Sequence, residues 1–213
     1  MSDLEHFLTT DYAQHFGVTW DSSVMIIRKE TPSSVHFEIE DQQPAIIQPA
    51  TKGVSVFHRN DTFAEVIDLE EFMKQIHGTA HTPSTCDFVL SPSVGTQYLV
   101  FNELTRTQSG YILHFRQQDS GEEQEGKLEK ARRQLTETIN RFYAVSDFCD
   151  RYENKTALFS CRLSDKRSNG IMARSSKMFN KTIYKLQRMT LHEELPHGFL
   201  FKIRIYNAEY ELN

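Results

Sequence analysis

Cys86-Asp87-Phe88-Val89-Leu90 and Tyr98-Leu99-Val100-Phe101-Asn102-Glu103-Leu104 are two short apolar runs of the composition that β-strands favour. The link between them, Ser91-Pro92-Ser93-Val94-Gly95, is short and rich in turn residues, so the two runs are predicted to form a hairpin. Asp87 stands near the start of one run and Glu103 near the end of the other. Because side chains alternate along a strand, both carboxylates can face one side and share a divalent cation.

The residues before this hairpin alternate between strand and turn signals. Asp68 is predicted to cap a helix, with Glu71 completing a capping box and Gly78 ending it. We predict a loop over 42–52 and strands over 24–27, 35–39, 54–57 and 63–67.

The residues after the hairpin predict a long helix from about 122 to 143, with an apolar stripe at Leu128, Ala131, Leu135, Ile139 and Phe142. A strand is expected at 156–161, a second helix at 176–190 and a closing strand at 199–205. We therefore expect one α/β domain over 1–213, a mixed sheet flanked by helices. It comprises a β-rich part (1–62), a core (63–162), and a basic helix with the closing strand (163–213).

Composition sets the class of protein. The chain has 213 residues, 38% hydrophobic and 25% charged, which is enough for one core and too little for two comfortable domains. No apolar run approaches the ~20 residues of a membrane span, and the acidic start does not resemble a signal peptide. Three widely spaced cysteines suit a reduced cytoplasm better than a disulfide framework.

The hairpin and the helix after it resemble the metal-binding core of the PD-(D/E)XK, restriction-endonuclease-like nuclease superfamily. In that family an Asp opens the hairpin, an acid-x-Lys triplet ends it, and a following helix carries a Gln. The resemblance, which covers about residues 63–162, implies that Asp87 and Glu103 hold Mg²⁺, with Glu70 or Glu71 as a further acid from the preceding helix. It also assigns the helix position to Gln134.

The third place of the triplet departs from the family pattern, because Thr105 stands where active members usually carry Lys. A threonine hydroxyl is a poor substitute for a cation that orients or deprotonates water and offsets phosphate charge. Arg106 follows, but adjacent strand residues point to opposite faces. Lys127 and Lys130, on the helix that carries Gln134, are candidates to supply the missing cation.

Three functions stay open at this point. The resemblance favours a catalytically degenerate component of a restriction or antiphage defence complex, acting on or beside DNA with a larger partner such as an ATPase. One alternative is an active Mg²⁺-dependent nuclease whose lysine has moved to Lys127 or Lys130. Another is a structural subunit that docks partners through its charged faces.

His77, His81 and Cys86 form a second candidate site. Their side chains are of the types that hold zinc, but a structural zinc site needs four ligands and only three are present. We expect His77 to interact with helix-end carbonyls and Cys86 to be a buried, inert thiol.

Charge is distributed unevenly along the chain. Residues 1–125 hold 7 Lys/Arg against 19 Asp/Glu, and residues 126–213 hold 17 against 10. A row at helical spacing is predicted to bind a polyanion or a partner, the alternative being a solvated face. The row is Arg174, Lys177, Lys181, Lys185 and Arg188.

Overall fold

The computed structural model describes residues 1–40, 45–47, 53–60, 63–107, 111–113, 115–116, 123–163, 193–205 and 209–213. Its central feature is a mixed seven-stranded sheet, which confirms the α/β class. The strand order is β1 (Lys29–Glu30), β5 (Ala64–Asp68), β6 (Phe88–Pro92), β7 (Tyr98–Thr107), β10 (Asn154–Leu163), β12 (Phe199–Ile205) and β11 (Glu193–Leu195). Strands β7, β10 and β12 are parallel, and the other neighbours are antiparallel.

A second sheet has four strands, in the order β13 (Glu209–Leu212), β4 (Ser55–Arg59), β2 (His36–Ile39) and β3 (Ile46–Ile47). Strand β13 runs parallel to β4, with Glu209 paired to Val56. A separate two-stranded ribbon joins β8 (Phe115–Arg116) to β9 (Glu123–Gln124).

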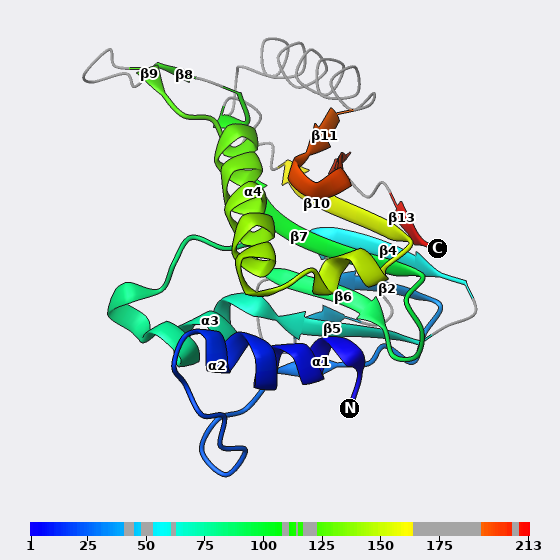
Figure 1. The fold of residues 1–213 in the computed structure, drawn as a ribbon. Coiled ribbons are helices and arrows are strands. Elements are labelled where there is room, and N and C mark those ends of the chain that lie inside the picture. Colours follow the sequence, from blue (N-terminus) through cyan, green and yellow to red (C-terminus); the bar gives the residue numbers. More distant parts are fainter. Residues whose placement is uncertain are drawn as a thin grey trace.

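Helices cover one face of the large sheet and the second sheet covers the other (Figure 1). The main helices are α3 (Leu69–His77) and α4 (Lys127–Val145), beside an N-terminal group of α1 (Asp3–Phe7), the π-helix η1 (Leu8–Tyr12) and α2 (Ala13–His15). Short 3-10 turns are η2 (Thr79–His81), η4 (Phe148–Arg151) and η5 (Pro196–Gly198).

Alternation along β7 explains why there are two cores. Leu99 and Phe101 are buried on the helical face, where the Phe101 ring lies 4.8 Å from the Phe142 ring of α4. Val100 and Leu104 are buried on the opposite face against the second sheet. Since a strand sends successive side chains to opposite faces, a strand with apolar residues at both parities needs cover on both sides.

Most elements around the hairpin are confirmed. Asp68 caps α3 by accepting a hydrogen bond from the Glu71 amide at 2.9 Å, and Gly78 ends the helix with a φ of 78°. All five residues of the predicted α4 stripe are buried. The helix starts at Lys127 rather than near 122, because Glu123 and Gln124 pair with β8 and Gly126 has an extended backbone.

The strand predicted at 24–27 is wrong. The Val24 and Met25 amides donate to the Asp21 carbonyl in a turn, at 3.0 and 2.7 Å. The Gln75 side chain bonds both the N–H and the C=O of Ile26, at 2.9 and 2.8 Å. These local bonds occupy the backbone groups that a strand would use, so the sheet begins only at β1.

The description of residues 1–62 as β-rich is also incomplete, because the chain begins with helices. Ser2 caps α1 by accepting from the Glu5 amide, and the buried residues that follow are Leu4, Phe7, Leu8 and Tyr12. The predicted loop at 42–52 contains the short strand β3. The helix predicted at 176–190 lies outside the described residues.

Two further expectations concern the cysteines and membrane-spanning segments. Cys86, Cys149 and Cys161 are all buried free thiols. Among the helices that the structure describes, none has both the length and the apolar character needed to cross a membrane.

Candidate functional site

The hairpin register brings Asp87 and Glu103 together. Phe88 pairs with Asn102 and Val89 with Phe101 in the antiparallel β6–β7 ladder, which sets Asp87, one residue before β6, across from Glu103. Cross-strand partners in an antiparallel pair point to the same side. That side is the helical face, because Glu103 shares it with Phe101, two residues earlier on β7.

Hydrogen bonds from β7 and from the start of α3 hold Asp87 in place. Its carboxylate Oδ2 accepts a hydrogen bond from the Leu104 amide at 2.8 Å. Its carbonyl accepts from the amides of Leu69 and Glu70 in the first turn of α3, at 2.9 and 3.3 Å. Asp87 is therefore fixed between the second hairpin strand and the start of α3.

The buried Cys86 thiol lies close enough to both carboxylates to respond to their charges. Burial raises the pKa of the Cys86 thiol well above its ordinary value, and the negative charges of Glu103 and then Asp87 raise it further. Both acids therefore act on a single sulfur atom. Glu103 is itself buried, with only 8% of its surface exposed.

Helix α4 holds the segment that leads into Asp87. Gln134 donates from Nε2 to the Thr85 carbonyl at 3.0 Å, and the Thr138 hydroxyl accepts from the Cys86 amide at 2.9 Å. One turn later Arg141 donates to the Ser84 carbonyl at 3.0 Å. Gln134, expected at the site from its place in the sequence, thus contacts the residue two positions before Asp87.

Thr105 lies on the same face as Glu103, two residues further along β7, where it pairs with Cys161 of β10 and is half-buried. Arg106 points the other way, as strand alternation predicts, and its guanidinium bonds the Glu40 carboxylate at the end of β2. Lys127 and Lys130 have exposed side chains in the first turn of α4.

The acids proposed from α3 are engaged elsewhere. Glu71 forms ion pairs with Arg28 and Lys74 at 3.7 and 3.8 Å, and Glu70 with Lys74 at 3.0 Å. Within the described part of the chain, no group of three or more His, Cys, Asp and Glu side chains is arranged to hold a metal ion. Glu71 therefore does not join Asp87 and Glu103 as a third ligand. Its partner Arg28 directly follows residues 24–27, where the predicted strand does not form.

The zinc candidates are likewise not assembled. The His77 ring packs against the rings of Tyr12 and Phe16, with centroids 6.4 and 4.6 Å apart. Burial lowers the pKa of His77, and the nearby Arg141 charge lowers it further. His81 is exposed in η2 and Cys86 is buried, so these three residues serve separate local roles.

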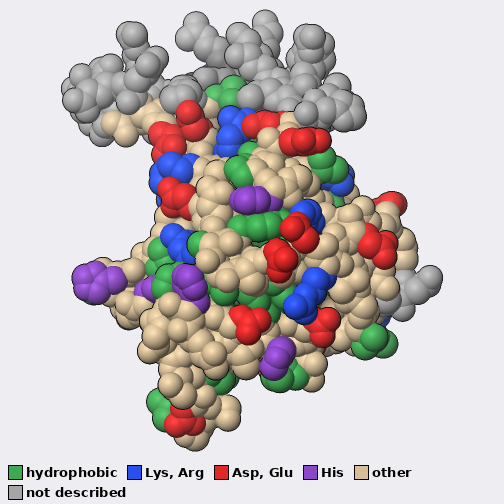
Figure 2. All heavy atoms as spheres, viewed as in Figure 1, with side chains coloured by type: hydrophobic (Ala, Val, Ile, Leu, Met, Phe, Trp, Pro, Cys, Tyr) green, Lys and Arg blue, Asp and Glu red, His purple; other side chains and the backbone are tan. Residues whose placement is uncertain are grey.

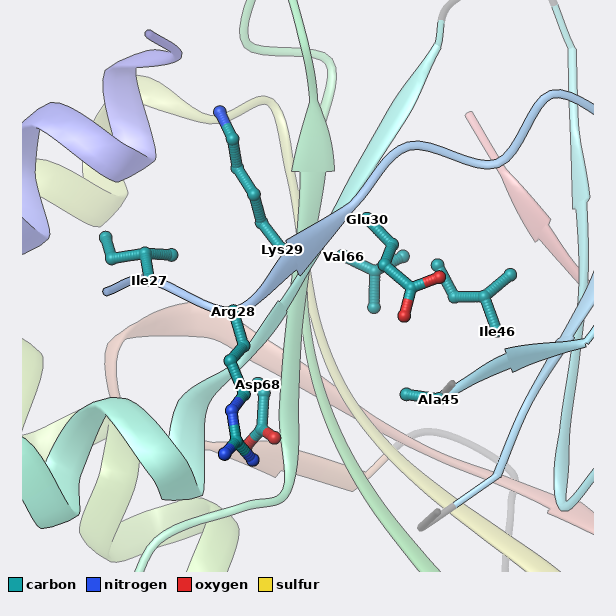
Figure 3. Close-up of a pocket in the computed structure, with 8 residues that line it drawn as sticks. All are labelled: Ile27, Arg28, Lys29, Glu30, Ala45, Ile46, Val66 and Asp68. Carbon is teal, nitrogen blue, oxygen red and sulfur yellow. The ribbon is translucent and has the colours of Figure 1, made fainter. Parts of the chain in front are cut away.

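A pocket that the sequence did not predict opens on the other face of the large sheet, at its β1 edge (Figure 3). Its volume is about 220 Å³, and it lies between the two sheets, where β1 and β5 face β3. The described residues that line it are Ile27, Arg28, Lys29, Glu30, Ala45, Ile46, Val66 and Asp68. No single run of sequence contains this set, which explains why pattern analysis missed it.

Asp68 closes one end of this pocket. Burial raises the pKa of Asp68, the hydrogen bond from the Glu71 amide lowers it, and the Glu71 carboxylate raises it. In Figure 3 the Arg28 guanidinium lies beside the Asp68 carboxylate. The pocket thus has a charged end and an apolar wall.

The predicted basic row from Arg174 to Arg188 lies outside the described residues. On the face shown in Figure 2, acidic and basic side chains are interspersed among neutral ones.

No protein-family model matches the chain, and no curated protein or solved structure shows significant similarity to it.

Proposed function

We propose that this protein is a catalytically degenerate nuclease-like protein that acts on or beside DNA, within a restriction or antiphage defence complex that includes a larger partner such as an ATPase. The single observation that supports this most is the opposition of Asp87 and Glu103 across the β6–β7 hairpin. Two carboxylates at one place are the ligand type that Mg²⁺ prefers.

The element order adds support. Helix α3 leads into the antiparallel β6–β7 hairpin, and α4 then crosses to β10, which is parallel to β7. This is the order that the PD-(D/E)XK resemblance implies, with Gln134 on the crossover helix. The second sheet on the opposite face is an addition that the resemblance does not include.

The chemistry proposed for the site is limited by Thr105. A cation held by Asp87 and Glu103 would polarise a phosphodiester and activate water for its attack. Thr105 is next to Glu103 on the same face and has no charge to orient that water or to balance the phosphate. We therefore expect cation binding without efficient cleavage.

Calorimetric titration with Mn²⁺ tests the site first. Wild type should give a saturable heat of Mn²⁺ binding. Glu103→Gln, which keeps the volume of the side chain, should lose most of that heat. Glu129→Gln, on the first turn of α4, is the matched control and should bind as wild type does. Wild type that shows no saturable heat would contradict a cation site.

Cleavage assays then distinguish the three functions. Wild type, Glu103→Ala, Lys130→Ala and Thr105→Lys are incubated with labelled duplex and single-stranded DNA and Mg²⁺. We expect wild type to be silent or weak, because losing a general base or electrostatic clamp typically costs roughly 10²–10⁴ in rate. Activity appearing only in Thr105→Lys supports the degenerate site. Robust cleavage by wild type that both alanine variants abolish would instead establish the migrated-lysine nuclease.

The basic row gives the proposal its DNA-binding element. Replacing Lys177, Lys181 and Lys185 with Glu should abolish DNA or partner binding measured by fluorescence anisotropy, because the change reverses three charges on one predicted helix face. Surface charges contribute little to stability, so the melting temperature should stay nearly constant. Binding that survives the triple change would make the row an ordinary solvated face.

A structural subunit is the second candidate, and one observation favours it. The Asp87 carboxylate already accepts a hydrogen bond from the Leu104 amide, and the Glu103 side chain is almost fully buried. Both acids therefore contribute to the structure of the hairpin. In that case all four variants would be silent, Mn²⁺ would not bind, and a protein partner would still associate.

A further inference from the structure

The pocket at the β1 edge contains an acidic side chain turned inward. Glu30 pairs with Val66 across β1 and β5, so both side chains point into the space between the two sheets. Figure 3 shows the Glu30 carboxylate directed towards Ala45 and Ile46. Lys29, the neighbouring residue, points to the opposite face, where its Nζ lies 2.5 Å from Glu5 and 3.6 Å from Glu65.

Among the described residues, the charges at the pocket leave one carboxylate, that of Glu30, without a partner. Arg28 pairs with Glu71 at 3.7 Å, and its charge also lowers the pKa of Asp68. Lys29 is balanced on the other face. In the described part of the chain Glu30 has no hydrogen bond or ion pair, although its side chain is only partly exposed and faces apolar neighbours. A carboxylate at an apolar wall gains most from a charge-assisted hydrogen bond.

The apolar residues that line the pocket indicate which kind of molecule would carry the cation. Val66, Ala45 and Ile46 provide an aliphatic lining, and the volume of about 220 Å³ suits a short chain of carbon atoms. A group with an aliphatic stem and a positive tip would place its stem on these residues and its tip at Glu30. Long cationic side chains bind in this way, with the stem on apolar surface and the charge in a polar environment.

We propose that this pocket is a binding site for an alkylammonium group. The group has two chemical sources, a free aliphatic amine or the lysine side chain of an extended protein segment. The site is separate from the hairpin carboxylates, since it opens on the opposite face of the large sheet, and it does not depend on the function proposed for them.

The probe is n-butylammonium chloride, titrated into the whole chain carrying ¹³C-labelled methyl groups and followed by NMR. The methyl signals of Val66, Ala45 and Ile46 should shift and saturate. 1-Butanol, which has the same number of heavy atoms and no charge, should move them far less. Sodium chloride at matched ionic strength corrects for screening.

Glu30→Gln is the decisive variant, and it should weaken n-butylammonium binding by roughly tenfold or more, because the charge-assisted bond is lost. Glu30→Asp keeps the charge with a shorter reach and should weaken binding less. The matched control is Glu194→Gln, on β11 at the opposite edge of the same sheet, which should bind as wild type does. Thermal melts of each variant confirm that the fold is kept.

A capped tripeptide, acetyl-Thr-Lys-Thr-amide, distinguishes the two sources. In the described structure β1 pairs only with β5, so a peptide can add backbone hydrogen bonds along its other edge. Tighter binding of the tripeptide than of n-butylammonium, with slowed amide exchange in β1, assigns the site to a lysine of a partner. Equal or weaker binding of the tripeptide assigns it to a free amine.

Three results would overturn the proposal: no saturable methyl shifts with n-butylammonium, equal shifts with 1-butanol, or unchanged binding in Glu30→Gln. If the amine does not bind and Glu30→Gln instead causes self-association, the inward charge protects an edge strand from pairing with other chains.

Discussion

Asn102 joins the two sheets through one buried amide. Its Oδ1 accepts from the Ser55 hydroxyl of the second sheet at 2.7 Å, and its Nδ2 donates to Leu158 O and Ser160 Oγ, both at 3.3 Å. We predict that Asn102→Leu lowers the free energy of unfolding by about 2–4 kcal/mol, because it leaves buried polar groups without partners. Urea denaturation measures the change.

The companion variant Ser55→Ala removes the hydroxyl that Asn102→Leu would orphan. The double variant should therefore be more stable than the sum of the two single changes implies, as expected for residues in one network. Strict additivity would show that the amide and the hydroxyl act independently.

The thiols supply a second prediction at this scale. Burial raises the pKa of Cys161 to about 12, and it raises the pKa of Cys149 to about 12 as well. At pH 8 only about one thiol in 10⁴ is then ionised, and the thiolate is the reactive form. We expect labelling by a disulfide reagent to be very slow in buffer and fast in urea. Rapid labelling of two or more thiols in the folded protein would contradict this.

At the level of single elements, Thr138 is one of three α4 residues that hold the segment before Asp87. Its hydroxyl accepts from the Cys86 amide and donates to the Gln134 carbonyl, at 2.9 and 2.8 Å. We predict that Thr138→Val, which keeps the shape, costs about 1–3 kcal/mol because the buried Cys86 amide loses its acceptor. Thr136→Val on the same helix is the control and should cost less than about 0.5 kcal/mol. Equal costs would assign the effect to helix propensity.

The elements that were predictable from sequence depend on local chemistry. The α3 cap, the α4 stripe and the hairpin follow from hydrogen bonding and periodicity within a few residues. The strand predicted at 24–27 failed because its backbone bonds Asp21 and the distant Gln75, which no local pattern reveals. The N-terminal helix could have been found from the Ser2 cap and the buried residues Leu4 and Phe7 at helical spacing.

The candidate site divides in the same way. The opposition of Asp87 and Glu103 follows from hairpin register alone, and the opposite orientation of Arg106 follows from strand alternation. The engagement of Glu71 could not be predicted, because its partner Arg28 is brought near by tertiary packing. The pocket around Glu30 requires two sheets to be stacked before it exists.

At the scale of the whole molecule, buried thiols make stability depend on alkaline pH. Folding raises the pKa of Cys86, Cys149 and Cys161, so the native state keeps protons that the unfolded state releases above about pH 9. Stability should be constant in this respect below pH 8 and fall as pH rises from about 9 to 11. The loss should be roughly 1.4 kcal/mol per thiol for each pH unit. Chemical denaturation across this range measures it.

Cys161→Ala checks the origin of that slope, because it removes one titrating thiol from a buried position. The variant should be less stable at pH 7 and should lose stability less steeply above pH 9. A slope identical to that of wild type would assign the alkaline loss to other groups.

The parallel pairing of β4 with β13 has a consequence for how the protein is made. Residues 55–59 are translated long before residues 209–212, and Tyr210 and Leu212 complete the core on that face. While the ribosome adds residues at roughly 5–20 per second, β4 has one unfilled edge and the apolar surface beneath it stays open to water. Until β13 is available to pair, the nascent chain should therefore keep this apolar surface exposed, and chaperones that bind apolar surface can recognise it there.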